Sequence, residues 1–311
     1  MEPRPSPDPV PAPPQAPTSN VTDTALIFEG GGMRASYTSA VVVTLLRAGI
    51  HIDWVAGISA GASNAVNYLS RDEWRSRHSF VDFVTDPQFG DWRTFVRGQG
   101  LFNSAYIYER TGMPGGAMPF DWETFCANPA RLRVGAVRCV DAEPVYWTEN
   151  DMAEPLDMMV RVRASSTMPG LMPLTTIDGI DYADGALGPS GGIPLDAAIA
   201  DGFDRFLVVL TRSRDYVKRP ARLPEFYRQV FRRYPAMAES ILTRWRGYNQ
   251  TREQLFDLER QGRAMLFVPD TMPVRNGERR VERLRAAHEL GLAQARQELP
   301  RWREFLGLDR A

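Results

Sequence analysis

The chain has few residues of the kinds that crosslink a fold or bind a metal ion. Its 311 residues include two cysteines, Cys126 and Cys139, and three histidines, His51, His78 and His288. Two cysteines are too few for a disulfide framework, and the histidines share no metal-ligand spacing with them. The sequence therefore predicts neither a disulfide-stapled fold nor a metal site. We expect no cofactor, and a reducing, cytoplasmic compartment fits best.

Long apolar runs are also missing. No stretch reaches the ~18 consecutive apolar residues of a spanning helix, and the first twenty residues lack the apolar core of a secretory signal. Membrane insertion and export are therefore both disfavoured, and we expect any contact with a membrane to be peripheral.

Lysine is scarce, and the basic side chains are unevenly distributed. Lys218 is the single lysine, so arginine carries almost all the positive charge, and arginine suits bidentate contacts with phosphate or carboxylate. Residues 1–204 hold 14 basic and 25 acidic side chains, whereas residues 205–311 hold 23 basic and 13 acidic. The positive charge of the C-terminal third indicates arginines spread over solvated helix faces. The alternative is peripheral contact with an anionic membrane surface.

What the sequence does contain is typical of a globular protein. Hydrophobic residues make up 43% and charged residues 24%, which excludes collagen-like and wholly disordered chains. Residues 1–20 include eight prolines and predict a disordered, Pro-rich tail. We expect a main domain over residues 21–215 and a helical C-terminal extension over residues 216–311 that packs on it.

The main domain begins with a strand–helix–strand–helix pattern. Thr24–Phe28 and Ile52–Ala56 are β-prone, and Ala35–Ala48 and Ala62–Leu69 follow them as helical segments. This order predicts a right-handed parallel βαβ unit. Further along, the sequence predicts an irregular connector with short helices, two hairpins, two helices and a strand; these cover residues 71–130, 131–140 with 145–148, 174–177 with 180–183, 156–166, 194–200 and 206–210.

Two glycine-rich loops interrupt this first unit. Gly57-Ile58-Ser59-Ala60-Gly61 matches G-x-S-x-G, in which small neighbours let a serine sit on a sharp strand-to-helix turn with its hydroxyl exposed. A Gly/Ser-rich turn without chemistry would look similar, but the strand before the motif and the helix after it favour a nucleophilic Ser59.

The other loop, Gly30-Gly31-Gly32, predicts a nest of backbone N–H groups beside Ser59, provided the first two strands are neighbours. Arg34 follows and would contact a phosphate head group or steady the loop; a solvated first-turn arginine is the alternative. A dinucleotide site fits poorly, because Asp53 stands near the beginning of the second strand instead of its end. A mononucleotide P-loop is excluded because this region has no lysine.

A nucleophilic serine requires a base, and none of the three histidines follows a strand at the expected catalytic edge. Asp184 is the better candidate, because it ends a predicted hairpin and precedes Gly185. A carboxylate can act as the base directly if burial raises its pKa. An Asp-Gly turn without chemistry would be the default interpretation of Asp184 alone, but not beside Ser59 and the glycine loop.

Together these segments resemble the bacterial branch of the patatin-like phospholipases. The resemblance rests on Glu29–Arg34, Gly57–Gly61 and Asp184–Ala186, and it extends through residues 164–170 and 207–212. It implies a three-layer α/β/α patatin-like fold with a central, mostly parallel sheet, and a Ser59–Asp184 dyad that hydrolyses lipid esters without histidine or metal. Residues 21–215 would then be the catalytic domain. The sequence departs from the family pattern at Glu29, Ala35 and Ala186.

The sequence therefore predicts a serine acyl hydrolase acting on lipid or acyl-ester substrates, with Gly30, Gly31 and Gly32 as the oxyanion hole and Arg34 as a substrate contact. Residues 112–119, rich in glycine and methionine, are either a flap over the acyl pocket or a static connector. The main alternative is a catalytically weak protein that binds lipid or acyl groups in the same pocket. A nucleic-acid-binding protein is disfavoured because the sequence holds no module of that kind.

Overall fold

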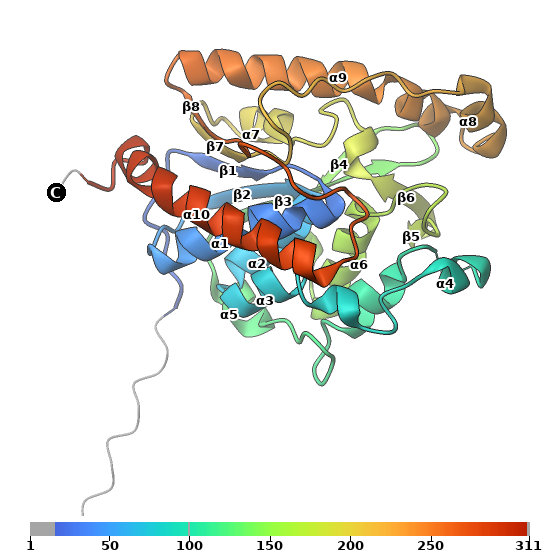
Figure 1. Ribbon diagram of the computed structural model, residues 1–311, viewed down its shortest axis with the longest axis horizontal. Helices are drawn as coiled ribbons and strands as arrows, with labels where there is room; N and C mark the ends of the chain where they lie inside the picture. The colour runs from blue at the N-terminus through green and yellow to red at the C-terminus, as the bar shows by residue number, and fades with distance from the viewer. Residues whose placement is uncertain (1–15, 99, 310–311) are drawn as a thin grey trace, which may run out of the picture.

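The computed structural model describes residues 16–98 and 100–309 (Figure 1). Most of the predicted Pro-rich tail, residues 1–15, lies outside the described residues. Val21, where the sequence predicts the main domain to begin, is buried and forms a parallel bridge with Ile52.

Within the described residues, eight strands form one sheet in the order β5-β6-β3-β2-β1-β7-β8, with β4 also paired to β3. The pairs along β3-β2-β1-β7-β8 are parallel, and those made by β4, β5 and β6 are antiparallel. The strands are β1 (Ala25–Phe28), β2 (Trp54–Ile58), β3 (Arg131–Arg138), β4 (Pro144–Trp147), β5 (Thr175–Ile177), β6 (Ile180–Asp184), β7 (Phe206–Val209) and β8 (Ala264–Phe267).

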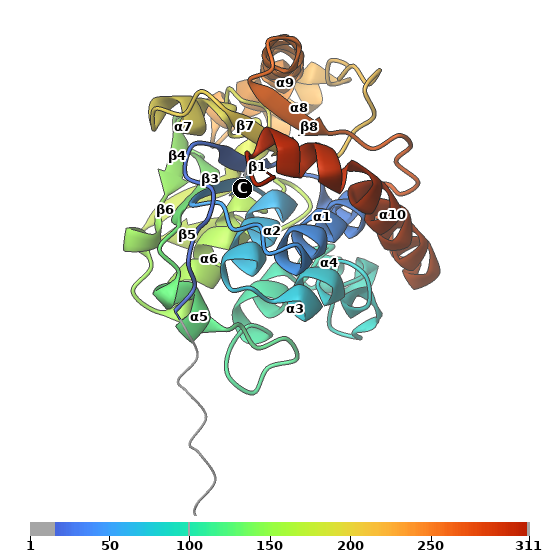
Figure 2. The same cartoon turned by 90° about the vertical axis from the view of Figure 1, so that its left-hand side faces the viewer.

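Helices cover both faces of this sheet (Figure 2). The α-helices are α1 (Ala35–Arg47), α2 (Ala60–Leu69), α3 (Glu73–His78), α4 (Trp92–Val96), α5 (Trp122–Ala127), α6 (Pro155–Ser165), α7 (Leu195–Ala200), α8 (Pro224–Val230), α9 (Pro235–Arg260) and α10 (Val281–Phe305). Short 3₁₀ turns are Gly32–Arg34, Phe83–Thr85, Glu149–Asp151 and Gly185–Leu187, and Tyr106–Arg110 is a π-helical turn.

Alternation along the strands divides the core into two layers. In β1, Leu26 and Phe28 belong to a core shared with α1, α2, α6 and α10, whereas Ala25 and Ile27 belong to a core shared with α7 and α9. Because successive side chains of a strand point to opposite faces, β1 is buried on both sides. The predicted three-layer α/β/α fold with a mostly parallel sheet is confirmed.

The predicted local units are present at the predicted places. β1 and β2 are parallel neighbours, with Leu26 opposite Val55. Both hairpins form, as β3 with β4 and β5 with β6. In the second hairpin Asp178 and Gly179 both have positive φ, 50° and 79°, as a type I′ Asp-Gly turn requires. The segment 71–130 holds α3, α4 and α5 with irregular links.

The C-terminal region is predominantly helical, as the sequence predicts, and it also contributes one strand to the sheet. β8 extends the parallel sheet beyond β7, and α9 and α10 cover opposite faces of it. The apolar run of β8 is only four residues long, too short for periodicity to separate a strand from a helix interruption. Across the described ranges, no helix combines the length and apolarity that crossing a membrane requires.

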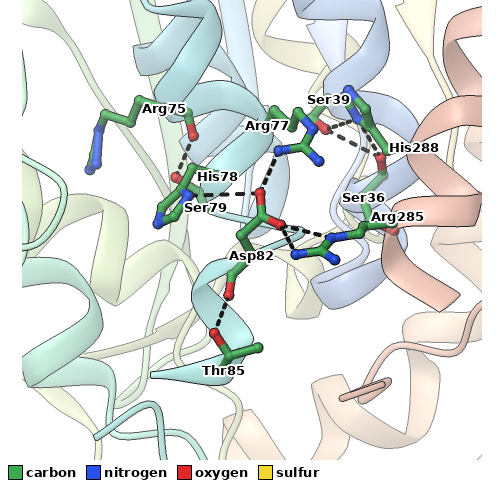
Figure 3. Close-up of polar contacts among 10 residues, drawn as sticks. All are labelled: Ser36, Ser39, Arg75, Arg77, His78, Ser79, Asp82, Thr85, Arg285 and His288. Carbon is green, nitrogen blue, oxygen red and sulfur yellow. Dashed lines mark hydrogen bonds and ion pairs between the residues drawn. The ribbon is translucent and has the colours of Figure 1, made fainter. Parts of the chain in front are cut away.

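Polar contacts fix α10 against α1 and α3 (Figure 3). The Arg285 guanidinium lies 2.9 Å from a carboxylate oxygen of Asp82, which also contacts Arg77 and His78. The Nδ1 atom of buried His288 lies 3.1 Å from the Ser36 carbonyl oxygen. These contacts therefore fix α1, the helix that follows the glycine loop.

Candidate active site

Ser59 occupies a strained turn between β2 and α2. Its backbone has φ 59° and ψ −129°, a conformation that residues other than glycine rarely adopt. The flanking glycines make the turn possible, because a Cβ atom on Gly57 would lie 2.2 Å from the Gly61 carbonyl oxygen. The turn is therefore tight enough to exclude side chains at both motif glycines.

Replacing Gly61 with alanine is expected to destabilise the fold. In most helices this change adds about 1 kcal/mol of stability, but here the new Cβ would lie 2.2 Å from the Phe28 carbonyl oxygen, which belongs to backbone. We expect a net loss of about 1–3 kcal/mol in the free energy of unfolding, the usual range for overpacking.

Chemical denaturation measures the effect of this change. Gly277→Ala is the matched control, because a Cβ atom there meets only open space and the backbone φ is not in the left-handed region. An unchanged unfolding free energy for Gly61→Ala would show that the turn has room for a Cβ atom at this position.

Asp184 ends β6 beside this turn. In β3, Gly135 is opposite Ile58 and the next residue, Ala136, is opposite Asp184, so the ends of β2 and β6 meet along one strand. The Ser59 Oγ atom donates to the Asp184 Oδ2 atom at 2.9 Å, and both residues are only 8% exposed. The structure thus brings together two residues that are 125 positions apart in the chain.

The second carboxylate oxygen of Asp184 is also held. Its Oδ1 atom accepts from the Ala186 N–H at 2.9 Å, so Ala186, a departure from the family pattern, supplies the required donor through its backbone. Burial raises the pKa of Asp184, opposed by the positive charge of Arg244 and by the Ala186 and Ser59 hydrogen bonds. The carboxylate is therefore oriented and more basic than an exposed aspartate.

Ser165 positions Ser59 and was not assigned a role from the sequence. Its hydroxyl accepts from the Ser59 N–H at 2.8 Å and donates to the Gly135 carbonyl oxygen at 2.5 Å. Ser165 is completely buried, so it acts on the turn through these two bonds. The segment 164–170 does carry part of the family resemblance, which is the one signal in the sequence that points to it.

The glycine loop packs against the serine turn, but its three N–H groups are not equivalent. A Cβ atom on Gly30 would lie 3.1 Å from the Ser59 Cβ atom. The Gly30 N–H donates to the Gly192 carbonyl oxygen at 3.0 Å, so it is engaged. Within the described residues, the N–H groups of Gly31 and Gly32 have no hydrogen-bond acceptor. The predicted oxyanion hole stays a prediction, and this geometry favours Gly31 and Gly32 over Gly30 as its donors.

The other departures from the family pattern are accommodated locally. The Glu29 carboxylate is buried and accepts from the Thr211 N–H and, at 2.8 Å, from the Tyr248 hydroxyl. It therefore ties the glycine loop to β7 and α9. The Ala35 methyl group packs with Ala60 and Phe80 in a small apolar cluster.

A cavity of about 360 Å³ lies beside Ser59 and Asp184. Its lining includes Ser59, Asp184 and the three loop glycines, and none of the described residues 112–119. One part of the wall is apolar and comprises Phe80, Phe89, Phe102, Ile107, Met168 and Met172; another is basic and comprises Arg34, Arg212, Lys218 and Arg244. Arg34, predicted as a substrate contact, is thus in the lining, 8% exposed, with its pKa lowered to about 10 by burial and by Arg212.

The histidines lie elsewhere. His288 and His78 belong to the contacts between α10, α1 and α3 in Figure 3, and His51 contacts Arg71. Of the described residues, no histidine lines the cavity. Among the residues that the structure places, no group of three or more His, Cys, Asp or Glu side chains could hold a metal ion.

The fold and this site define an α/β protein of three layers in which a serine on a strand-to-helix turn faces a buried carboxylate. Residues 26–199 match the family model described as Patatin-like phospholipase. The match covers more than half of the chain, which therefore belongs to the patatin-like phospholipase family. Residues 234–307 match a second family model, Domain of unknown function (DUF6363).

Comparisons with individual proteins give low sequence identities. The chain is 30% identical over 192 residues to the Uncharacterized protein YjjU of Escherichia coli strain K12, across 60% of this chain and 51% of YjjU. It thus spans about half the length of that curated relative. Among solved structures, VipD from Legionella pneumophila aligns with a TM-score of 0.43 and 12% identity, over 88% of this chain and 67% of that chain.

Proposed function

We propose that the protein is a serine acyl hydrolase that cleaves carboxylic esters of lipids. The observation that carries the proposal is the 2.9 Å hydrogen bond from the Ser59 hydroxyl to Asp184 on the wall of a partly apolar cavity. A hydroxyl bonded to an oriented, buried carboxylate has the base that a serine nucleophile requires. Membership of the patatin-like phospholipase family supports lipid esters as the substrate class.

In the first half of the reaction the Ser59 Oγ atom attacks the acyl carbonyl carbon, and its proton passes to Asp184. The N–H groups of Gly31 and Gly32 would stabilise the negative charge that develops on the carbonyl oxygen. The N-terminus of α2, directly after Ser59, adds partial positive charge at the same place. When the intermediate collapses, the leaving alkoxide takes the proton from Asp184, and the acyl group remains on Ser59.

The second half uses the same groups with water. The water oxygen attacks the acyl carbonyl carbon while Asp184 accepts a proton from that water. The new tetrahedral intermediate collapses, the Ser59 Oγ atom regains the proton from Asp184, and the fatty acid leaves. The enzyme returns to its initial protonation state, so one ester and one water give one acid and one alcohol.

A catalytically weak lipid-binding protein would use the same cavity, and a fluorophosphonate probe separates the two functions. Such a probe forms a covalent adduct only with an activated serine. We expect labelling at Ser59 in the native protein, located by peptide mass spectrometry, together with release of fatty acid from a lipid panel. Lipid binding without an adduct at Ser59 would favour the binding protein.

As the pH is lowered, hydrolysis is expected to be lost at a higher pH than it would be with an exposed aspartate as the base. Asp184 must be ionised to accept a proton, and burial raises its pKa above the usual value of about 3.9. As the pH is lowered through that raised pKa, the fraction of active base falls. The measurement is kcat/KM against pH with a soluble p-nitrophenyl ester, with circular dichroism as the control for folding. An acid limb at or below the ordinary pKa would contradict the role of Asp184.

Peripheral contact with an anionic membrane remains a prediction, as does the cytoplasmic location. In support of membrane contact, Leu223, Phe226 and Val230 on and beside α8 are exposed, and Tyr227 of the same helix lines the cavity. Exposed apolar side chains next to a lipid-binding cavity are typical of a surface that meets a membrane.

A further inference from the structure

The basic part of the cavity wall was not expected from the sequence beyond Arg34. Arg212 follows β7, Lys218 lies in the loop before α8, and Arg244 projects from α9. All three line the cavity together with Arg34, and Asp184 is the acidic residue in the described lining. Four basic side chains thus share with one carboxylate the lining of a space large enough for part of a lipid.

These basic side chains are unpaired, which distinguishes them from the other arginines. In the part of the chain that the structure describes, none of the four has a carboxylate oxygen within 4.0 Å, whereas many arginines elsewhere do. The buried carboxylate of Glu29 influences Arg34 and Lys218 electrostatically, but it accepts from the Thr211 N–H and the Tyr248 hydroxyl. The positive charge at the wall therefore exceeds the negative charge around it.

Aromatic faces and backbone groups hold this charge in place. The Lys218 Nζ atom lies 4.4 Å from the ring centre of Tyr248, and the Arg212 guanidinium carbon lies 4.3 Å from that of Tyr216. Asn249 accepts from the Lys218 N–H at 2.9 Å and donates to the Lys218 carbonyl oxygen at 3.0 Å. Cation–π contacts position a cation without neutralising it, so the charge stays free for a ligand.

A second cavity, of about 460 Å³, adjoins the first. Lys218 and Arg244 line both spaces, as do Leu187 and Ile241, and the second cavity is bounded further by the loop 216–221 and by Trp245. A ligand group held between Lys218 and Arg244 would therefore lie at the junction, with Ser59 in one cavity and room for a polar substituent in the other.

We propose that Arg34, Arg212, Lys218 and Arg244 form a subsite for the phosphate group of a phospholipid. Acyl chains would lie along the apolar wall, and the head-group alcohol would extend into the second cavity. Guanidinium forks match the oxygens of phosphate, and the combined charge suits an anion better than a neutral acylglycerol. This assignment rests on the proposed function and adds to it the residues that select the substrate.

The titration of Lys218 gives the subsite a pH signature. Burial and the positive charges of Arg244, Arg34 and Arg212 lower the pKa of Lys218 to about 7, against the opposing effect of Glu29. Lys218 therefore loses its charge near neutrality, and its contribution to phosphate binding falls as the pH rises. A phosphodiester head group does not titrate in this range, so it serves as a clean reporter.

The test compares two lipids with the same acyl chains, dioleoyl phosphatidylglycerol and dioleoylglycerol, at equal mole fraction in neutral detergent micelles. The ratio of their kcat/KM values is expected to fall at least about tenfold in Lys218→Met and in Arg244→Gln. Arg246→Gln, an exposed arginine on the same helix, should keep the wild-type ratio. In the wild type the ratio should fall as the pH rises through about 7, and this dependence should disappear in Lys218→Met. An equal ratio in all four proteins would overturn the subsite.

Inorganic phosphate provides a binding measurement that needs no catalysis. We expect it to raise the melting temperature of the wild type and of Arg246→Gln, but not of Arg244→Gln. Stabilisation by phosphate with an unchanged lipid ratio would assign the subsite to free phosphate and overturn the head-group assignment. If no variant hydrolyses any ester and Ser59 takes no fluorophosphonate, the proposed function fails, and the phosphate measurement then tests separately whether these side chains bind phosphate. Circular dichroism identifies any variant that does not fold.

Discussion

Ser59→Ala is expected to abolish ester hydrolysis while the fold remains intact. The alanine has no oxygen to attack the acyl carbonyl carbon, so no acyl-enzyme forms, whatever the state of Asp184 and the glycine loop. Loss of a serine nucleophile lowers kcat by about 10⁴- to 10⁶-fold in serine hydrolases. The measurements are turnover of a p-nitrophenyl ester, release of fatty acid from phospholipid, and labelling by a fluorophosphonate, and all three should be lost together.

Two controls separate chemistry from folding in this experiment. The Ser59 side chain donates one hydrogen bond, to Asp184, and the strained backbone is the same for serine and alanine, so the melting temperature should change by only a few degrees. Ser63→Ala removes a hydroxyl one turn later in α2 and should retain activity and labelling. Wild-type turnover in Ser59→Ala would reject the proposed nucleophile.

The first part of the fold could be predicted from local pattern because its signals agree. An apolar strand, a glycine loop, a helical segment and a second strand follow one another before Gly61, and the strands pair in parallel as the connection requires. The second strand lies two residues later than predicted, at Trp54–Ile58. Gly57 is part of the predicted turn but belongs to the strand, where it pairs with Phe28 and Val134. The position requires glycine because a Cβ atom there would lie 2.2 Å from the Gly61 carbonyl oxygen.

Local pattern suggests that Ser59 and Asp184 act together, but it does not determine the distance between them. The motif supplied a nucleophile and the hairpin supplied a carboxylate, but their separation depends on the register of β6 against β3. The engagement of the Gly30 N–H by Gly192 depends on a backbone contact across 162 positions, which no local pattern encodes. Tertiary register thus decides which of the predicted groups are available for chemistry.

The basic wall could not be predicted for a different reason. Arginine is common throughout the C-terminal third, and composition gives no sign of which arginines face inward. Arg244 points into the cavity because α9 packs closely on the loop 188–193, where a Cβ atom on Gly247 would lie 2.0 Å from the Pro189 carbonyl oxygen. Arg246, two residues later on the same helix, is exposed. Close helix packing therefore determines which charge reaches the cavity.

Asp184→Asn is expected to lower kcat by about 10⁴-fold, the scale seen when an aspartate that supports a serine nucleophile is changed to asparagine. The amide keeps the shape of the carboxyl group, and its oxygen can still accept from the Ala186 N–H. It cannot take a proton from Ser59, so the attacking hydroxyl stays protonated. The residual turnover should also lose the acid limb of the pH profile, because the group that produces the limb is gone.

The stability of the same variant shows whether the loss is chemical. Burial raises the pKa of Asp184 above its unfolded value, so ionising this group in the folded protein at neutral pH lowers stability, and the loss sets in as the pH rises through the unfolded pKa toward the folded pKa. A neutral asparagine avoids this loss, and the free energy of unfolding at pH 7 should equal or exceed that of the wild type. Asp178→Asn, in the β5–β6 turn outside the cavity lining, is the matched control and should change neither quantity. A variant that unfolds more easily than the wild type would make Asp184 a structural residue, whereas an inactive protein of equal or greater stability requires that its charge serves the reaction.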